Sequence, residues 1–305
     1  MTRHLVDIAS LSVAELRHIL DLSVAAPKSA LSGKGVALIF EKPSNRTRHS
    51  MEMAVVQLGG HPVYTRGEEV GFDVRESVED VTRIMAGYHA VLAARVFRHS
   101  FIERMVAVSD VPIINMLSDA SHPLQALADI ITMEEHVGPI AQSTVAYIGD
   151  YNNVARSLAE AVCLLGGTIS LGCPSAYDAD DDELARLASL GGSVRQSASP
   201  QEAITGAHVV HTDTWISMGQ EEESVMRRKI FSKYCVDASL MSLAAPNAKF
   251  MHCLPVRRNV VVDDAVIDSE NSIVIQQAGN RVWAAQVVLK EMILTLMRQE
   301  SPYLF

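Results

Sequence analysis

Short runs of apolar residues alternate along the chain with segments whose apolar residues recur every three or four positions. The run at residues 36–41 has the composition of a buried strand. In the next segment, residues 47–58, the apolar side chains share one face of a helix, which Gly59 and Gly60 end. Residues 61–65 then have the pattern of another strand. This strand–helix–strand order predicts a parallel pair of strands.

The same order returns in the second half of the chain. Residues 145–150 predict a strand, residues 154–165 a helix and, after a second Gly-Gly pair, residues 168–172 another strand. Further strands are predicted at residues 91–97, 111–115, 207–212, 248–253 and 272–277. Two such sets of elements predict an α/β fold with two doubly wound parallel-sheet domains.

Helix signals mark the two ends and the middle of the chain. Ser12 and Glu15 form a capping box for an N-terminal helix, and Pro123 suits the first turn of a helix in the middle. A long terminal helix is predicted over about residues 280–297. The stretch 136–143 between helix and strand patterns is the predicted domain boundary. The domains are accordingly expected at residues 1–137 and 138–280.

Composition narrows the classes of function. The chain has 305 residues, of which 48% are hydrophobic, enough for a substantial core, and its net charge of −10 argues against a nucleic-acid partner. No apolar run approaches membrane-spanning length, and no signal-peptide core precedes the first helix pattern. The four cysteines show no metal-ligand spacing, so free thiols in a reducing cytoplasm are expected, with no metal and no cofactor.

Polar residues with chemical capability follow several predicted strands. Because ligands of open α/β sheets bind beyond the carboxyl ends of the strands, these residues are candidates for a site. They are the segment 43–48 after the first strand, Arg95, His122 with Gln125, Asn152 with Asn153, Asp213 with the segment 217–219, and the segment 252–255.

Each candidate also has a purely structural reading. Ser44 and Arg46 at a helix start would bind a phosphate, or they would cap the helix and lie in solvent. Arg95 interrupts an apolar strand and needs an anion, which an internal ion pair would equally supply. His122 is more often a capping residue than a catalyst, and a buried cysteine such as Cys253 is usually inert. Their joint occurrence at strand ends favours a site.

Four motifs together resemble the aspartate and ornithine carbamoyltransferase family. Residues 40–48 (FEKPSNRTR) resemble its carbamoyl-phosphate signature, and residues 122–125 (HPLQ) its H-P-x-Q motif. Residues 213–221 (DTWISMGQE) and 252–255 (HCLP) look like the motifs of the ornithine branch. The matches follow the family's order over nearly the whole chain.

The resemblance implies specific roles for these residues. The carbamoyl-phosphate site would comprise Ser44, Asn45, Arg46, Thr47, Arg95, His122, Gln125, Cys253, Leu254 and Arg281. The ornithine site would comprise Asn153, Asp213, Ser217 and Met218. Arg46, Arg95, His122, Asp213 and Cys253 would be catalytic. The two substrates implied are carbamoyl phosphate and L-ornithine, the product is L-citrulline, and the pathway is arginine biosynthesis.

The resemblance also implies an architecture. Residues 281–305 would form a helix that returns to the first domain, residues 1–137, which would bind carbamoyl phosphate, while residues 138–280 would bind ornithine. The family is usually trimeric, and residues 65–80 resemble the loop that reaches a neighbouring subunit's site. A homotrimer is therefore expected.

Three departures from the family pattern keep alternatives open. Asn45 stands where Thr is commoner, and Gly279 stands where Glu is usual. The run of residues 256–260, with Arg257 and Arg258, is similar to that of relatives that act on N-acylated ornithine. The alternatives are therefore a carbamoyltransferase that acts on an N-acylated ornithine or another amine, and a non-catalytic regulatory homologue. A dehydrogenase is disfavoured, because the turn at residues 149–153 lacks a dinucleotide fingerprint.

Overall fold

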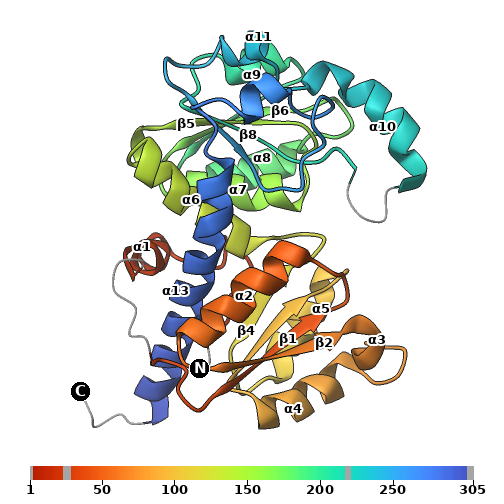
Figure 1. Ribbon diagram of the computed structural model, residues 1–305, viewed down its shortest axis with the longest axis vertical. Coiled ribbons are helices and arrows are strands. Elements are labelled where there is room, and N and C mark those ends of the chain that lie inside the picture. Colours follow the sequence, from red (N-terminus) through yellow and green to blue (C-terminus); the bar gives the residue numbers. More distant parts are fainter. Residues whose placement is uncertain (1–2, 23–28, 217–220, 301–305) are drawn as a thin grey trace. The chain divides into compact units, whose positions relative to one another are not determined.

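The structure of the protein is a computed structural model, which describes residues 3–22, 29–216 and 221–300 (Figure 1). The chain divides into two compact units. The first comprises the chain up to Leu127 together with the chain from Arg281 onward, and the second runs from Ala128 to Asn280. None of the helices in the described ranges is both long and apolar enough to span a bilayer.

The first unit is built on a four-stranded parallel sheet in the order β2-β1-β3-β4. Its strands are β1 (Gly35–Phe40), β2 (His61–Arg66), β3 (Val91–Arg95) and β4 (Ile113–Leu117). The chain passes from β1 outward to β2 and then returns to the other side of β1 with β3. The strand order therefore reverses between β1 and β3, which is the place where such sheets bind ligands.

Helices cover both faces of this sheet (Figure 1). They are α1 (Val13–Asp21), α2 (Asn45–Gln57), α3 (Gly67–Val70), α4 (Val78–Tyr88) and α5 (His99–Val108). Alternate residues of β1 and β3, among them Ile39 and Leu92, pack with Val81 of α4 and Ile102 of α5 in one core cluster. Because β1 and β3 are buried on both faces, their sequences are apolar throughout except for Arg95 at the end of β3.

The second unit contains a five-stranded parallel sheet in the order β7-β6-β5-β8-β9. Its strands are β5 (Thr144–Ile148), β6 (Thr168–Gly172), β7 (Ser193–Ser197), β8 (Val209–Thr212) and β9 (Lys249–His252). Here the order reverses between β5 and β8. Polar residues that follow β5 and β8 are thus brought to one place.

Of the helices that lie wholly within the second unit, α7 is the longest. They are α7 (Asn153–Leu164), α8 (Asp181–Ala188), α9 (Pro200–Ile204), α10 (Ser224–Phe231), α11 (Ala238–Met241) and α12 (Asp264–Ile267). Short 3-10 turns lie at η2 (Ile140–Gln142), η3 (Glu221–Glu223) and η4 (Ser232–Tyr234). Phe231 of α10 and Phe250 of β9 lie in the apolar core of this unit with residues of α9, α11 and α12.

Two helices contribute residues to both units: α6 (Pro123–His136) and α13 (Val274–Glu300). The capping box of α1 and the start of α6 at Pro123 are confirmed. The predicted C-terminal helix is also confirmed, and its residues from Arg281 belong to the first unit. The structure divides the units at Leu127, within α6, whereas the sequence places the domain boundary just after that helix.

The predicted strand at residues 272–277 is wrong. Only Ser272 makes a β-bridge, with Phe250, and α13 begins at Val274. A short apolar run cannot be assigned to strand or helix by its composition. The burial pattern explains the outcome, because Val274, Gln277 and Arg281 are buried at helical spacing while Ile275 is exposed. The long helix therefore starts six residues before the predicted residue 280.

Candidate active site

The carboxyl ends of β1 and β3 form a cationic site in the first unit. Ser44 caps α2, and its Oγ accepts a hydrogen bond from the backbone N–H of Thr47 at 3.4 Å. Arg95, the last residue of β3, is buried and donates from Nη1 to Thr47 Oγ1 at 3.4 Å. Arg281, also buried, donates from Nη2 to the same hydroxyl at 2.9 Å. Two guanidinium groups thus converge on one helix N-terminus.

This convergence suits a doubly charged anion. A helix N-terminus presents unpaired N–H groups and a partial positive charge, and arginine forks match phosphate oxygens. Arg46 lies half-buried in the first turn of α2, and Asn45 is the exposed first residue of that helix. Two buried guanidinium groups beside a helix N-terminus are an arrangement that suits an anion ligand.

His122 and Gln125 join this site through Arg281. The guanidinium Nη1 of Arg281 donates to Gln125 Oε1 and lies 3.5 Å from His122 Nε2. Burial, together with the charges of Arg281 and Arg95, holds the pKa of His122 well below its usual value. The imidazole is therefore neutral near pH 7 and offers one donor and one acceptor. All five predicted groups, Thr47, Arg95, His122, Gln125 and Arg281, belong to this one unit.

A second polar cluster forms at the carboxyl ends of β5 and β8 in the second unit. Gly149 has a φ of 138°, a conformation that suits glycine, and turns the chain out of β5. Asn152 then caps α7, since its Oδ1 accepts from the N–H groups of Val154 and Ala155 at 2.9 and 3.1 Å. Its Nδ2 donates to Asp213 Oδ2 at 2.9 Å.

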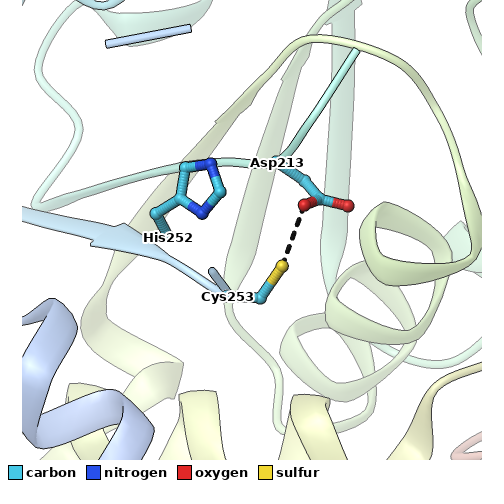
Figure 2. Close-up of side chains that lie close together, drawn as sticks. All are labelled: Asp213, His252 and Cys253. Carbon is cyan, nitrogen blue, oxygen red and sulfur yellow. Dashed lines mark hydrogen bonds between the residues drawn. The ribbon is translucent and has the colours of Figure 1, made fainter. Parts of the chain in front are cut away.

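Asp213 also contacts the predicted cysteine. Cys253 follows β9, and its Sγ lies 2.9 Å from Asp213 Oδ1, as Figure 2 shows. Asp213 is buried, and both of its oxygens accept a hydrogen bond. A carboxylate beside a thiol can hold an ammonium group and then share the proton that the amine loses. Asn152, which follows the same predicted strand as Asn153, is thus a hydrogen-bond partner of Asp213.

Asp213, His252 and Cys253 are the one group of described residues whose potential ligand atoms come close enough for a metal ion, within 4.8 Å of one another. Their protein contacts account for the arrangement. Cys253 donates a hydrogen bond to Asp213, and His252 Nδ1 accepts one from the backbone N–H of Leu254 at 2.8 Å. We therefore assign these side chains to a hydrogen-bonded turn.

Two further predictions concern other segments. Ser217 and Met218 lie outside the described residues. Within residues 65–80, Phe72 is buried, and Asp73 and Glu79 form ion pairs with Arg104 of α5. Phe72, Asp73 and Glu79 thus hold the second half of the segment to its own unit, whereas Val74 is 89% exposed.

Sequence reasoning missed several buried polar residues of the second unit. Gln277, Asp129 and His211 make hydrogen bonds to one another behind β9, and Arg227 pairs with Asp150 at 2.9 Å. Their signal in the sequence is weak, because none of them lies in a recognisable motif with its partner. Only the fold brings them together, as Asp129 and Gln277 are 148 positions apart.

Comparison with known proteins places both halves of the chain in one family. Residues 3–135 match the carbamoyl-P binding domain of the aspartate/ornithine carbamoyltransferases, and residues 141–292 match their Asp/Orn binding domain. The ornithine carbamoyltransferase of Hyperthermus butylicus is 46% identical over 264 residues, which cover 85% of this chain and 84% of that protein. The anabolic ornithine carbamoyltransferase of Pyrococcus furiosus is 42% identical over 270 residues, or 87% and 86% of the two chains.

A solved structure agrees with these matches. The ornithine carbamoyltransferase from Pyrococcus furiosus superimposes with a TM-score of 0.90 at 40% identity, covering 94% of this chain and 96% of that one. This chain belongs to the aspartate/ornithine carbamoyltransferase family.

Proposed function

We propose that this protein transfers the carbamoyl group of carbamoyl phosphate to the side-chain amine of L-ornithine, producing L-citrulline and phosphate for arginine biosynthesis. One observation carries the proposal: each sheet reverses its strand order beside a polar cluster of the required chemistry. The first cluster, around Thr47, is cationic and suits a phosphate. The second, Asp213 with Cys253, suits a cationic amine.

The first unit would hold the donor. The N-terminus of α2 with Arg46 binds the phosphate, while Arg95 and His122 polarise the carbamoyl carbonyl. The proposed carbamoyl-phosphate site consists of Ser44, Asn45, Arg46, Thr47, Arg95, His122, Gln125, Cys253, Leu254 and Arg281. Since His122 is neutral, it donates a hydrogen bond to the carbonyl oxygen without adding a positive charge that would hold back the departing phosphate.

The second unit would hold the acceptor through Asn153, Asp213, Ser217 and Met218, to which the structure adds Asn152. An alkylammonium is protonated at neutral pH and must lose a proton before it attacks. Asp213 and Cys253 draw off that proton. The neutral nitrogen then forms a bond to the carbonyl carbon, the bond from this carbon to the phosphate oxygen breaks, and the second proton of the nitrogen passes to the departing phosphate. No electrons are exchanged with another group, so we propose no cofactor and no metal.

Free ornithine is the proposed acceptor, because the structure explains the run that resembles enzymes for N-acylated ornithine. Arg258 pairs with Asp264 at 2.8 Å and with Asp268 at 2.6 Å. Asn259 has a φ of 57°, and its Oδ1 accepts the N–H of Asp264. These residues thus stabilise the start of α12. Of the two arginines, only the exposed Arg257 has no such role among the described contacts.

We further propose that the enzyme is a cytoplasmic homotrimer. The four cysteines are free thiols, as expected in a reducing compartment. The first unit leaves Met53, Val56 and Val63 partly exposed near the edge strand β2, a surface that a second copy would cover. The proposed domains are residues 1–137 for carbamoyl phosphate and 138–280 for ornithine, with residues 281–305 returning to the first.

The acceptor assignment is tested by comparing kcat/KM for L-ornithine, N-acetylornithine, lysine, putrescine and aspartate with saturating carbamoyl phosphate. We expect L-ornithine to have the highest value, and Arg257→Ala to keep this order. A higher value for N-acetylornithine that Arg257→Ala abolishes would replace ornithine by an N-acylated acceptor. Phosphate release no faster than the spontaneous decay of carbamoyl phosphate with every amine would instead indicate a non-catalytic homologue.

A further inference from the structure

A buried glutamine contacts the backbone beside the proposed catalytic cysteine. Gln277 lies in the first turn of α13 and is 1% exposed. Its Oε1 accepts a hydrogen bond from the backbone N–H of His252 at 2.9 Å. Its Nε2 donates to Asp129 Oδ1 at 2.7 Å and lies 3.1 Å from His211 Nε2. One side chain thus links α13, α6 and β8 to the end of β9, all within the second unit.

These partners fix the orientation of the amide. A backbone N–H can only donate, so it is the oxygen of Gln277 that faces His252. The NH₂ group must then point toward Asp129 and His211, where a carboxylate and a ring nitrogen can accept. Asp129 and His211 are fully buried, and His211 stacks on Tyr147 with ring centroids 5.7 Å apart. The amide therefore has one strongly preferred position.

The fixed backbone N–H lies immediately before Cys253. On the other side of Cys253, the N–H of Leu254 donates to His252 Nδ1 at 2.8 Å, and Leu254 has a φ of 57°. The cysteine is thereby held between two anchored residues. This geometry directs its sulfur to Asp213 Oδ1 at 2.9 Å (Figure 2). The distance depends on the backbone of residues 252–254, because the cysteine side chain is short.

We infer that Gln277 is a positioning residue for the Cys253–Asp213 pair. It touches neither proposed substrate group and acts through the His252 backbone. The inference rests on the proposed function for its effect on turnover, but its effect on the cysteine is independent of any substrate. An amide fits the position because it supplies an acceptor for the N–H and donors for Asp129 and His211 at once, which few other side chains do.

The test compares four variants of the full chain. Gln277→Met keeps the length of the side chain and removes every hydrogen bond, and Gln277→Asn keeps the amide but is too short to reach His252. Gln277→Glu keeps an oxygen acceptor for the His252 N–H and, as a protonated carboxyl shared with Asp129, an O–H donor toward that residue. Gln276→Met alters the exposed neighbour and is the matched control. The measurements are kcat and KM for both substrates, and the rate at which iodoacetamide alkylates Cys253, followed by peptide mass spectrometry.

We expect Gln277→Met and Gln277→Asn to lower kcat by roughly 10- to 100-fold, the scale for misplacing a reacting group by about 1 Å. The KM for carbamoyl phosphate should stay within about twofold, since the residues proposed to bind its phosphate, around Thr47, belong to the other unit. Cys253 should be alkylated faster, because its contact with Asp213 loosens. Gln277→Glu should recover most of the turnover, and Gln276→Met should behave like the wild type.

Unchanged kcat and unchanged alkylation in Gln277→Asn would overturn the inference, as would a loss that Gln277→Glu fails to restore. If Gln277→Met does not fold, the contrast between the asparagine and glutamate variants decides. If the wild type does not carbamoylate ornithine at all, the proposed function fails, and the alkylation rates alone then decide whether Gln277 positions Cys253.

Discussion

At the scale of single residues, the hydroxyl of Thr47 joins the groups of the proposed donor site. Ser44, Arg95 and Arg281 all donate a hydrogen bond to this one oxygen, although they come from three different segments of the chain. A hydroxyl is small enough to let the two guanidinium groups approach the start of α2. The positive charge of the site thus depends on a side chain that carries none.

Among the predicted phosphate ligands, Arg46 makes the fewest described side-chain contacts with the rest of the protein. It is half-buried, and its guanidinium makes no ion pair with the part of the chain that the structure describes. Arg46→Ala should therefore lower kcat by about 10²- to 10³-fold, the usual scale for losing one transition-state donor. The thermal midpoint should stay near that of the wild type. The exposed Arg195→Ala of β7 is the control, and near-normal turnover in Arg46→Ala would place the phosphate elsewhere.

His122 should make the stability of the protein sensitive to acid. Burial and two arginine charges lower its pKa in the folded state well below the value of about 6.5 in the unfolded chain. Below pH 6.5 the unfolded state therefore binds a proton at His122 that the folded state does not bind. The free energy of unfolding should fall by up to about 1.4 kcal/mol per pH unit from this residue alone as the pH drops below 6.5.

Urea denaturation at pH 7.5 and 5.5 measures this contribution. The difference between the two free energies of unfolding should be smaller in His122→Gln than in the wild type. His49→Gln, at an exposed position of α2, should keep the wild-type difference. Equal differences in all three proteins would mean that His122 is readily protonated in the folded state.

At the scale of elements, the exposed position of Gly279 on α13 explains why a glycine is tolerated there. This glycine lies on the exposed face of the helix, and a Cβ added there would meet no atom within 4 Å. Arg281 is held by Thr47 and Gln125, so the glycine does not loosen it. Gly279→Ala should stabilise the protein by about 0.5–1 kcal/mol, because alanine favours the helix, and should leave kcat unchanged.

Urea titration and turnover assays of Gly279→Ala check this pair of expectations. Asn280, the next residue, is bonded to Thr132 and Glu135 and serves as a contrast, since Asn280→Ala should destabilise. A loss of activity in Gly279→Ala would show that the exposed face of α13 contributes to the site.

The elements that the sequence predicts best are those buried on both faces. Strands β1, β3 and β5 are apolar over most of their length, and the residues after them are the predicted site residues. The edge strand β7 was not predicted, because its sequence, SVRQS, has few apolar side chains. The start of α13 was misread as a strand, because the run of isoleucine and valine at its beginning is compatible with both structures.

The candidate site likewise contains residues that the sequence predicts and residues that it does not. Residues at or after strand ends, such as Arg95, His122 and Asp213, can be identified in the sequence because several polar groups occupy such positions. Gln277 and Asp129 are not, since their partners are distant in the chain and each has an ordinary role when considered alone. Asn152 and Asn153 are equivalent in composition, and only the geometry of the α7 cap distinguishes them.

At the scale of the whole molecule, we expect a homotrimer whose sites use residues of neighbouring copies. Mixing two inactive variants tests this directly. One is Arg46→Ala, and the other lacks residues 73–76 at the exposed tip between α3 and α4. If each site combines Arg46 of one copy with the tip of another, random reassembly should restore activity at about a quarter of the sites. No recovery, together with a monomer by light scattering, would contradict the shared site.

The central claim is that this chain forms a bond between the carbamoyl carbon and the side-chain nitrogen of ornithine. The most direct measurement is NMR of a reaction with ¹³C-labelled carbamoyl phosphate and L-ornithine labelled with ¹⁵N at the side-chain amine. We predict a ¹³C resonance split by the directly bonded ¹⁵N, which grows as phosphate is released and is absent without enzyme. A reaction in which carbamoyl phosphate decays at its uncatalysed rate, and no ¹³C–¹⁵N coupled signal forms, would contradict the account.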